Sequence, residues 1–128
     1  MQKTQTIMIV DDDEDDRELF CEAITEIAGH FKCVDAENGE LALIYLNDEK
    51  RPLPDYIFLD LNMPRLNGKQ CLAEIKKMEH LKSIPVIIYS TSNHQQDREI
   101  TLQLGATGFL HKPTEFNKLC MELKRWID

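Results

Sequence analysis

Short apolar runs alternate along this chain with longer segments of helical periodicity, and this alternation restricts the fold more than any other feature. The predicted strands are 7–10, 31–36, 56–60, 86–89 and 107–111, and the predicted helices are 15–28, 39–47, 68–79, 94–104 and a last helix after Thr114. Strands that alternate with helices form a parallel sheet covered by helices on both faces. The pattern therefore predicts an α/β fold, a doubly wound five-stranded parallel sheet with five helices, in one domain spanning residues 1–128.

Capping residues and apolar spacing predict the ends and faces of the helices. Asp15, with Glu18 three residues later, is typical of a capping pair, and the expected inner face of this first helix is Leu19, Phe20, Ala23, Ile24 and Ile27. Thr114 is expected to cap the last helix, with an apolar stripe of Phe116, Leu119, Cys120, Leu123, Trp126 and Ile127. The helix over 94–104 is more polar, so we expect Ile100 and Leu104 to be its main apolar anchors.

Charge and hydropathy disfavour several classes of partner. The net charge of −8 opposes non-specific binding to nucleic acid or to an anionic membrane. Near the N-terminus only four apolar residues follow one another, which is too short for a signal-peptide core. The longest apolar run, 41–46, is far shorter than the ~20 residues of a membrane helix. We expect a cytoplasmic protein with no nucleic-acid or membrane partner and no second domain after the last helix.

Four cysteines are spread widely along the chain. Cys21, Cys33, Cys71 and Cys120 form no CxxC pair, and in a cytosolic chain we expect reduced, mostly buried thiols. A zinc site is not favoured, because no two of these cysteines or the four histidines stand at the spacing of zinc ligands.

Polar residues follow four of the five predicted strands. In an open parallel sheet, sites form beyond the carboxyl ends of the strands. The acidic run 11–16 follows the first strand, Asp60 ends the third, Ser90 follows the fourth and Lys112 follows the fifth. Each residue has a local structural explanation, such as a helix cap or a solvated side chain. Their convergence on one edge predicts a site.

Asp60 is the centre of this predicted site. It ends an apolar run, and Pro64 biases Met63 away from helix, while Asn67 and Gly68 favour a turn or a helix entry. Asp60 should therefore lie where a buried strand enters a loop. A lone carboxylate there could cap a helix or accept hydrogen bonds from the loop, but the surrounding residues favour a nucleophile.

The polar residues also carry a family resemblance. The chain is similar, in order and at suitable spacing, to the receiver domain of two-component response regulators, on the segments Val10-Asp11-Asp12, Leu59 to Pro64 through Gly68, Ser90 and Lys112-Pro113. This resemblance covers essentially the whole chain and implies a flavodoxin-like sheet of strand order 2-1-3-4-5. It implies that Asp60 accepts a phosphoryl group from a sensor histidine kinase or a histidine phosphotransfer protein.

The resemblance also implies a metal site. Asp11 and Asp12 would help to hold Mg²⁺, with the side chain of Asp60 and the backbone carbonyl of Asn62 as further ligands. Carboxylates ~4 Å apart repel each other by several kcal/mol at an effective dielectric near ~20. A hard divalent cation relieves this repulsion, and oxygen ligands suit Mg²⁺.

Four further residues take roles from the same resemblance. Ser90 and Lys112 would contact the phosphoryl oxygens, and Ser90 with Phe109 would form the switch that alters the surface of the fourth helix, fifth strand and fifth helix. Phe109 stands where a tyrosine is frequent, so packing alone should govern its ring. The bond between Lys112 and Pro113 is a candidate cis peptide.

Other residues of the loops receive more ordinary interpretations. Asp13 to Asp16 are expected to be helix-start charges favoured by the helix dipole rather than metal ligands. Asp55 is expected to have a structural loop role. Thr91, which follows Ser90, is expected to narrow access to the site. Thr91 and Ser92, with the acidic first loop, resemble stand-alone receivers paired with phytochrome-type kinases.

The main alternative is a receiver-like adaptor that binds its partner independently of phosphate. The complete set of acidic, hydroxyl and lysine residues argues against it. An EF-hand fails because Asp16 stands where that loop needs glycine. We expect a Mg²⁺-dependent phosphoacceptor with slow self-dephosphorylation rather than an enzyme. Its downstream partner is an unknown protein, and the sequence leaves open whether it forms a homodimer.

Overall fold

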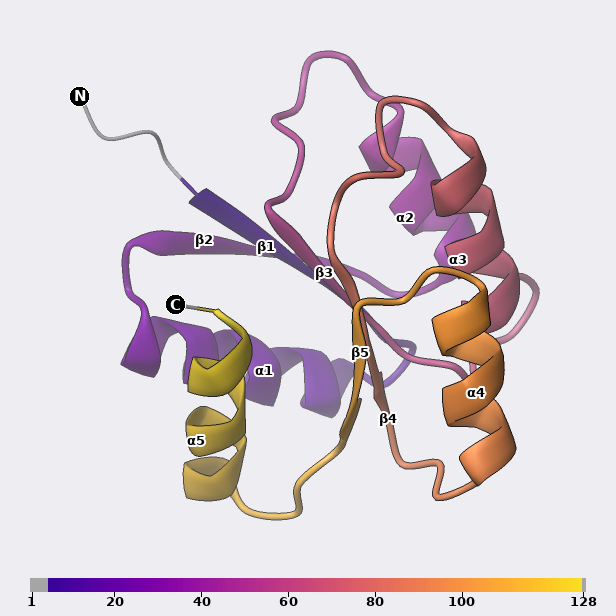
Figure 1. The fold of residues 1–128 in the computed structure, drawn as a ribbon. Coiled ribbons are helices and arrows are strands. Elements are labelled where there is room, and N and C mark those ends of the chain that lie inside the picture. The colour runs from indigo at the N-terminus through magenta and orange to yellow at the C-terminus, as the bar shows by residue number, and fades with distance from the viewer. Residues whose placement is uncertain (1–4, 128) are drawn as a thin grey trace.

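A computed structural model describes residues 5–127 as a sheet between two layers of helices (Figure 1). The remaining positions of the predicted domain, 1–4 and 128, lie outside the described residues. The elements in chain order are β1 (Gln5–Val10), α1 (Glu14–Ile27), β2 (Phe31–Ala36), α2 (Gly39–Leu46), β3 (Tyr56–Leu59), α3 (Gly68–Lys77), β4 (Val86–Ser90), α4 (Gln95–Gln103), β5 (Gly108–His111) and α5 (Phe116–Trp126).

The sheet confirms the predicted fold and strand order. All neighbouring strands are parallel, in the order β2-β1-β3-β4-β5. Val10 pairs with Leu59, so the residues that follow them, Asp11 and Asp60, leave the sheet side by side. At the far edge Ser90 pairs with His111, and the residue after His111 is Lys112. The register therefore brings the acidic loops and the lysine to the same end of the sheet.

Each face of the sheet has its own apolar core. The helices α1 and α5 cover one face, and α2, α3 and α4 cover the other (Figure 1). Successive strand residues point to opposite faces, so Met8 and Val10 of β1 enter the core under α2 and α3, whereas Ile7 and Ile9 enter the core under α1 and α5. These buried strands give the continuous apolar runs seen in the sequence.

Two helix starts differ from the prediction. The first helix begins at Glu14, and its cap is Asp13, whose side chain accepts from the backbone N–H groups of Asp15 and Asp16. The prediction that Asp15 caps it with Glu18 was therefore wrong, because several acids in a row offer equivalent caps. The cap of α5 is Glu115 rather than Thr114, and it makes no side-chain capping bond.

The polar character of α4 is confirmed, but its anchor is different. Thr101 is its buried residue, while the predicted anchors Ile100 and Leu104 are only partly buried. On the opposite face, Leu19 and Phe116 were placed inward by their spacing and are 45% and 37% exposed. None of the helices within 5–127 is long and apolar enough to cross a membrane.

The prediction of four reduced thiols was wrong for two cysteines. Cys21 of α1 and Cys33 of β2 form a disulfide, with their Cα atoms 5.6 Å apart. Their separation of 12 residues gave no sign of this, because the pairing depends on how α1 packs beside β2. Cys71 and Cys120 are free and buried, as expected.

Candidate functional site

Three carboxylates predicted as metal ligands lie together at the carboxyl end of the sheet. Asp11, Asp12 and Asp60 each offer an oxygen, and these oxygens lie within 4.8 Å of one another. Asp11 is fully buried and Asp60 is 5% exposed, whereas Asp12 is exposed. The cluster thus has two oxygen donors inside the protein and one at its surface.

The loop after β3 holds Asp60 firmly. Its Oδ1 accepts a hydrogen bond of 2.9 Å from the backbone N–H of Leu61. A Cβ on Gly68 would overlap the carbonyl oxygen of Asp60, so this position requires glycine. The loop then enters α3 through a capping box of Asn67 and Gln70. These contacts explain why the turn residues seen in the sequence follow Asp60.

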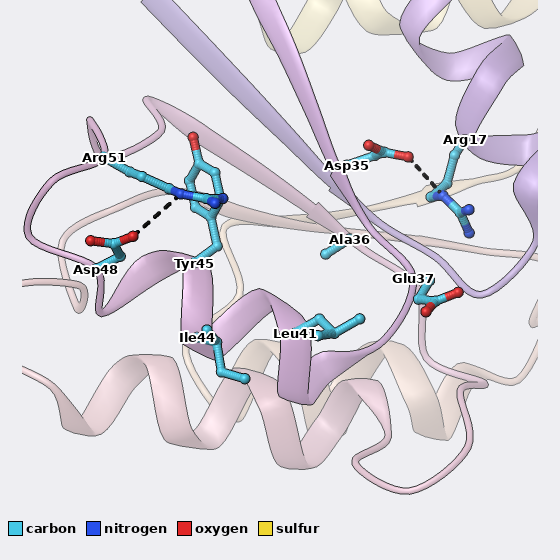
Figure 2. Close-up of a pocket in the computed structure, with 9 residues that line it drawn as sticks. All are labelled: Arg17, Asp35, Ala36, Glu37, Leu41, Ile44, Tyr45, Asp48 and Arg51. Carbon is cyan, nitrogen blue, oxygen red and sulfur yellow. Dashed lines mark hydrogen bonds and ion pairs between the residues drawn. The ribbon is translucent and has the colours of Figure 1, made fainter.

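The loop after β1 holds Asp11 in a similar way. Its Oδ1 accepts from the backbone N–H of Asp13 at 3.0 Å. The guanidinium of Arg17 donates to the Asp11 carbonyl at 2.8 Å and pairs with Asp35 at 2.9 Å, the ion pair drawn in Figure 2. Arg17 was not singled out in the sequence, and it ties this loop to the edge strand β2.

Lys112 reaches the cluster from the end of β5. Its Nζ lies 2.7 Å from Asp11 Oδ2, 2.9 Å from Asp16 Oδ2 and 3.9 Å from Asp60 Oδ2. The backbone of Lys112 also donates to the Ser90 carbonyl at 2.8 Å. Asp16 had been assigned only a helix-start role, because its place in the first turn of α1 gave no sign of a lysine 96 residues away.

Burial and charge shift the pKa values of this cluster. Burial raises the pKa of Asp60 to about 6, with Lys112 lowering it and Asp11 raising it. Burial also raises the pKa of Asp11, against hydrogen bonds from Lys112 and Asp13. Burial lowers the pKa of Lys112, but hydrogen bonds to Asp11 and Asp16 outweigh it and raise that pKa above its ordinary value. Burial is therefore the largest influence on the pKa values of both carboxyl groups.

The donor set fits a hard divalent cation. Asp11 and Asp60 are buried, and their oxygens lie within 4.8 Å of an oxygen of Asp12, so a single ion could contact all three carboxylates. An open cavity of about 450 Å³ lies beside the cluster, and its lining includes Asp12 and Asn62. Mg²⁺ and similar ions prefer carboxylate oxygens as ligands, and the open space leaves room for the water molecules that Mg²⁺ usually keeps.

The two predicted switch residues lie on neighbouring strands. Ser90 is fully buried, and its Oγ accepts from the backbone N–H of Ser92 at 3.1 Å. Phe109 is partly buried opposite Ile88, and the Arg98 guanidinium carbon lies 4.8 Å from its ring centroid. The expectation that packing alone governs this ring was incomplete, because a cation–π contact also holds it.

Two further predictions have clear outcomes. The bond between Lys112 and Pro113 is trans, as are all peptide bonds of the described residues, so the cis prediction was wrong. The small intrinsic preference of X–Pro bonds, ~0.5–1 kcal/mol, lets local context choose the isomer. Asp55 has a structural contact, since its Oδ2 accepts from the backbone N–H of Thr6 at 2.8 Å.

A second cavity of about 400 Å³ lies between the end of β2 and α2 (Figure 2). Its two arginines are already paired, Arg17 with Asp35 and Arg51 with Asp48. The remaining lining residues are Ala36, Glu37, Leu41, Ile44 and Tyr45. This cavity contains no carboxylate of the metal cluster, so the candidate site is at the strand ends.

The chain belongs to the family of response regulator receiver domains. The family's sequence pattern, described as "Response regulator receiver domain", matches residues 7–124. This confirms the resemblance seen in the sequence. Receiver domains are signalling switches of two-component systems rather than classical enzymes.

Curated relatives support the same assignment. The response regulator Rcp1 of Synechocystis is 30% identical over 119 residues, which cover 90% of this chain and 81% of Rcp1. The phosphate regulon transcriptional regulatory protein PhoB of Pseudomonas aeruginosa is 32% identical over 120 residues, or 94% of this chain. The chain spans only 50% of that PhoB.

Solved structures share the whole fold. The phosphorylated cyanobacterial phytochrome response regulator RcpA superimposes with a TM-score of 0.89 at 31% identity, covering 97% of this chain and 91% of RcpA. The Mn²⁺-bound form of Rcp1 gives a TM-score of 0.85 at 29% identity, covering 94% and 90% of the two chains.

Proposed function

We propose that this chain is a phosphorylation-activated switch in which Asp60 accepts a phosphoryl group from a phosphohistidine. The position of Asp60 beside Asp11, Asp12 and Lys112 carries this proposal. A carboxylate oxygen can attack phosphorus, so that the P–N bond breaks and an acyl phosphate forms. Such a transfer depends mainly on positioning and on charge stabilisation, and the fixed loops around Asp60 supply the positioning.

Asp11, Asp12 and the side chain of Asp60, with the carbonyl of Asn62, would hold Mg²⁺. When bound, the ion supplies positive charge against the phosphoryl oxygens. The carboxylate oxygens of Asp11, Asp12 and Asp60, which lie within 4.8 Å of one another, support a cation at this place. Lys112 would supply the second cationic contact to the phosphoryl group, and the Ser90 hydroxyl would donate to it.

The signal would leave the site through Ser90 and Phe109. Movement of the Ser90 hydroxyl toward the phosphoryl group would vacate space for the Phe109 ring, and so alter the surface formed by α4, β5 and α5. Because Arg98 contacts this ring, the movement would also change a contact with α4. The phosphoryl group must stabilise one of the two arrangements more than the other, because otherwise the equilibrium between them would not change.

The partners would be a sensor histidine kinase or a histidine phosphotransfer protein upstream, and another protein downstream. Similarity to RcpA, whose description names phytochrome, supports a kinase of the phytochrome type. A pull-down with and without beryllofluoride plus Mg²⁺ should recover a protein that binds only the activated form. Equal recovery in both conditions would favour the alternative, a receiver-like adaptor.

Intact-mass spectrometry tests the acceptor. A small-molecule phosphodonor with Mg²⁺ should add one phosphoryl group to the wild type and none to Asp60→Asn. The matched control is Asp15→Asn, which removes a carboxylate from the same end of the sheet and should be labelled as the wild type is. Undiminished labelling of Asp60→Asn would refute the assignment of Asp60 as the phosphoacceptor.

Thermal unfolding tests the metal site. Mg²⁺ should raise the melting temperature of the wild type by mass action, and Asp12→Ala should lose that increase. An equal Mg²⁺ shift in both proteins would place the bound ion elsewhere.

A further inference from the structure

Lys112 is shared among three carboxylates, and the acceptor is the most distant of them. Its Nζ is 2.9 Å from Asp16 Oδ2 but 3.9 Å from Asp60 Oδ2. The contact with Asp16 is also a hydrogen bond. The Lys112 side chain is 10% exposed and that of Asp16 is 35% exposed, so Asp16 holds the ammonium group from the solvent side.

We propose that Asp16 is a positioning residue, which restrains Lys112 and thereby limits the positive charge available to a phosphoryl group on Asp60. This inference rests on the proposed function, because it concerns the same acceptor. A phosphoryl group must draw the ammonium toward Asp60, and the hydrogen bond to Asp16 opposes that movement. Asp16 therefore sets how easily the resting site becomes the phosphorylated site.

The location of Asp16 suits a restraint that can be released. Its carboxylate is partly in solvent, so it regains hydration when Lys112 leaves. Asp11 differs, because it is fully buried and keeps its own contact with Lys112 at 2.7 Å. The pair is part-buried with one partner partly in solvent. Ion pairs near the surface contribute little, so its removal should shift an equilibrium by at least roughly 1.4- to 5-fold. Asp16 would therefore adjust the response without preventing it.

Asp15 provides a matched control. It lies next to Asp16 in the first turn of α1, and its carboxylate has no hydrogen bond or ion pair among the described residues. Asp15→Asn removes the same charge at nearly the same place without touching Lys112. Any general effect of one fewer negative charge near an anion should therefore appear in both variants.

The experiment measures beryllofluoride affinity at saturating Mg²⁺ for the wild type, Asp16→Asn, Asp16→Glu and Asp15→Asn. We expect Asp16→Asn to bind beryllofluoride at least about 3-fold more tightly than Asp15→Asn, in line with the range for ion pairs near the surface. Asp16→Glu keeps the charge and should return the affinity to the wild-type value. In a Lys112→Gln background, Asp16→Asn should have no more effect than Asp15→Asn.

Several results would overturn the inference. Equal affinities for Asp16→Asn and Asp15→Asn would remove the special role of Asp16, and weaker binding by Asp16→Asn would mean that Asp16 assists Lys112. If Lys112→Gln binds too weakly to measure, the Asp16→Glu rescue decides, and absence of rescue counts against the inference. A wild type that binds no beryllofluoride would instead refute the proposed function, so the two failures are distinguishable.

Discussion

The α1–α5 side of the molecule and the site edge are held together by different forces. We use the name α1–α5 side for α1, α5 and their contacts with the sheet, and site edge for the loops after β1, β3, β4 and β5 with the start of α4. On the α1–α5 side, Leu119 and Leu123 are buried, and the disulfide of Cys21 joins α1 to β2. At the site edge, Lys112 pairs with Asp11 and Asp16, and Lys69 pairs with Asp97.

The start of α4 illustrates the site edge. Its cap residue His94 makes no side-chain capping bond. Asp97 instead accepts a hydrogen bond from the Ser92 hydroxyl and pairs with Lys69 at 2.7 Å. Lys69, with Ser92, holds the pKa of Asp97 below its ordinary value. Apolar packing is insensitive to a new charge, whereas such polar contacts respond to one. A charge added at the proposed site should therefore affect the start of α4 more than the packing of α1.

The largest expected effect is on the α1–α5 side. Leu123→Ala should lower the free energy of unfolding by ~2–5 kcal/mol, because it removes a fully buried side chain and leaves a cavity. The control is Leu102→Ala on α4, which is 53% exposed and should cost less than ~0.5 kcal/mol. Urea unfolding measures both. Similar losses of unfolding free energy in the two variants would show that the apolar packing of α5 does not contribute more to stability than exposed Leu102.

Loss of the disulfide should have the second-largest effect on the free energy of unfolding. A reductant should lower the free energy of unfolding by ~2–3 kcal/mol, because a closed loop of this length restricts the unfolded chain. The pair Cys21→Ser with Cys33→Ser should show the same loss and no further response to reductant. Urea midpoints with and without dithiothreitol measure this. No response in the wild type would mean that the two thiols are not joined in solution.

At the site edge, the buried carboxylate of Asp60, the proposed acceptor, should lower the free energy of unfolding at neutral pH. The pKa of Asp60 is raised to about 6 from 3.8, so the unfolded carboxyl group ionises first. Stability in EDTA should therefore fall as pH rises from about 4 to 6 and then level off, by up to ~3 kcal/mol. Asp60→Asn should be more stable than the wild type at pH 7.5 and equal to it near pH 4. A wild type that is no less stable than Asp60→Asn at pH 7.5 would contradict a raised pKa of Asp60.

The smallest effect concerns the tether of α4. Lys69→Met should change global stability by less than ~1 kcal/mol, since the pair with Asp97 is partly exposed. It should nevertheless speed amide hydrogen exchange at the start of α4, because the cap residue His94 makes no side-chain bond that would hold this end. Lys77→Met, which breaks a more exposed pair with Glu74, is the control and should leave α4 unchanged. Protection of α4 that is equal in both variants would show that packing holds it.

Much of the fold and site followed from local patterns. The strand runs and turn signals predicted the parallel sheet, and the ends of parallel strands must share one edge. That rule alone predicted that Asp11, Asp60 and Lys112 lie close together. It worked because the residue after a buried strand has a position set by the sheet, and the register of Val10 with Leu59 places these loops side by side.

Contacts between elements could not be predicted in this way. The disulfide of Cys21 with Cys33, the hydrogen bond of Lys112 to Asp16 and the stacking of Arg98 on Phe109 each join residues whose local sequences carry no mark of the partner. They depend on how far a helix lies along its neighbouring strand and on which rotamer each long side chain adopts. Packing of the whole chain decides both, and hydrophobic periodicity reports only which face of a helix turns inward.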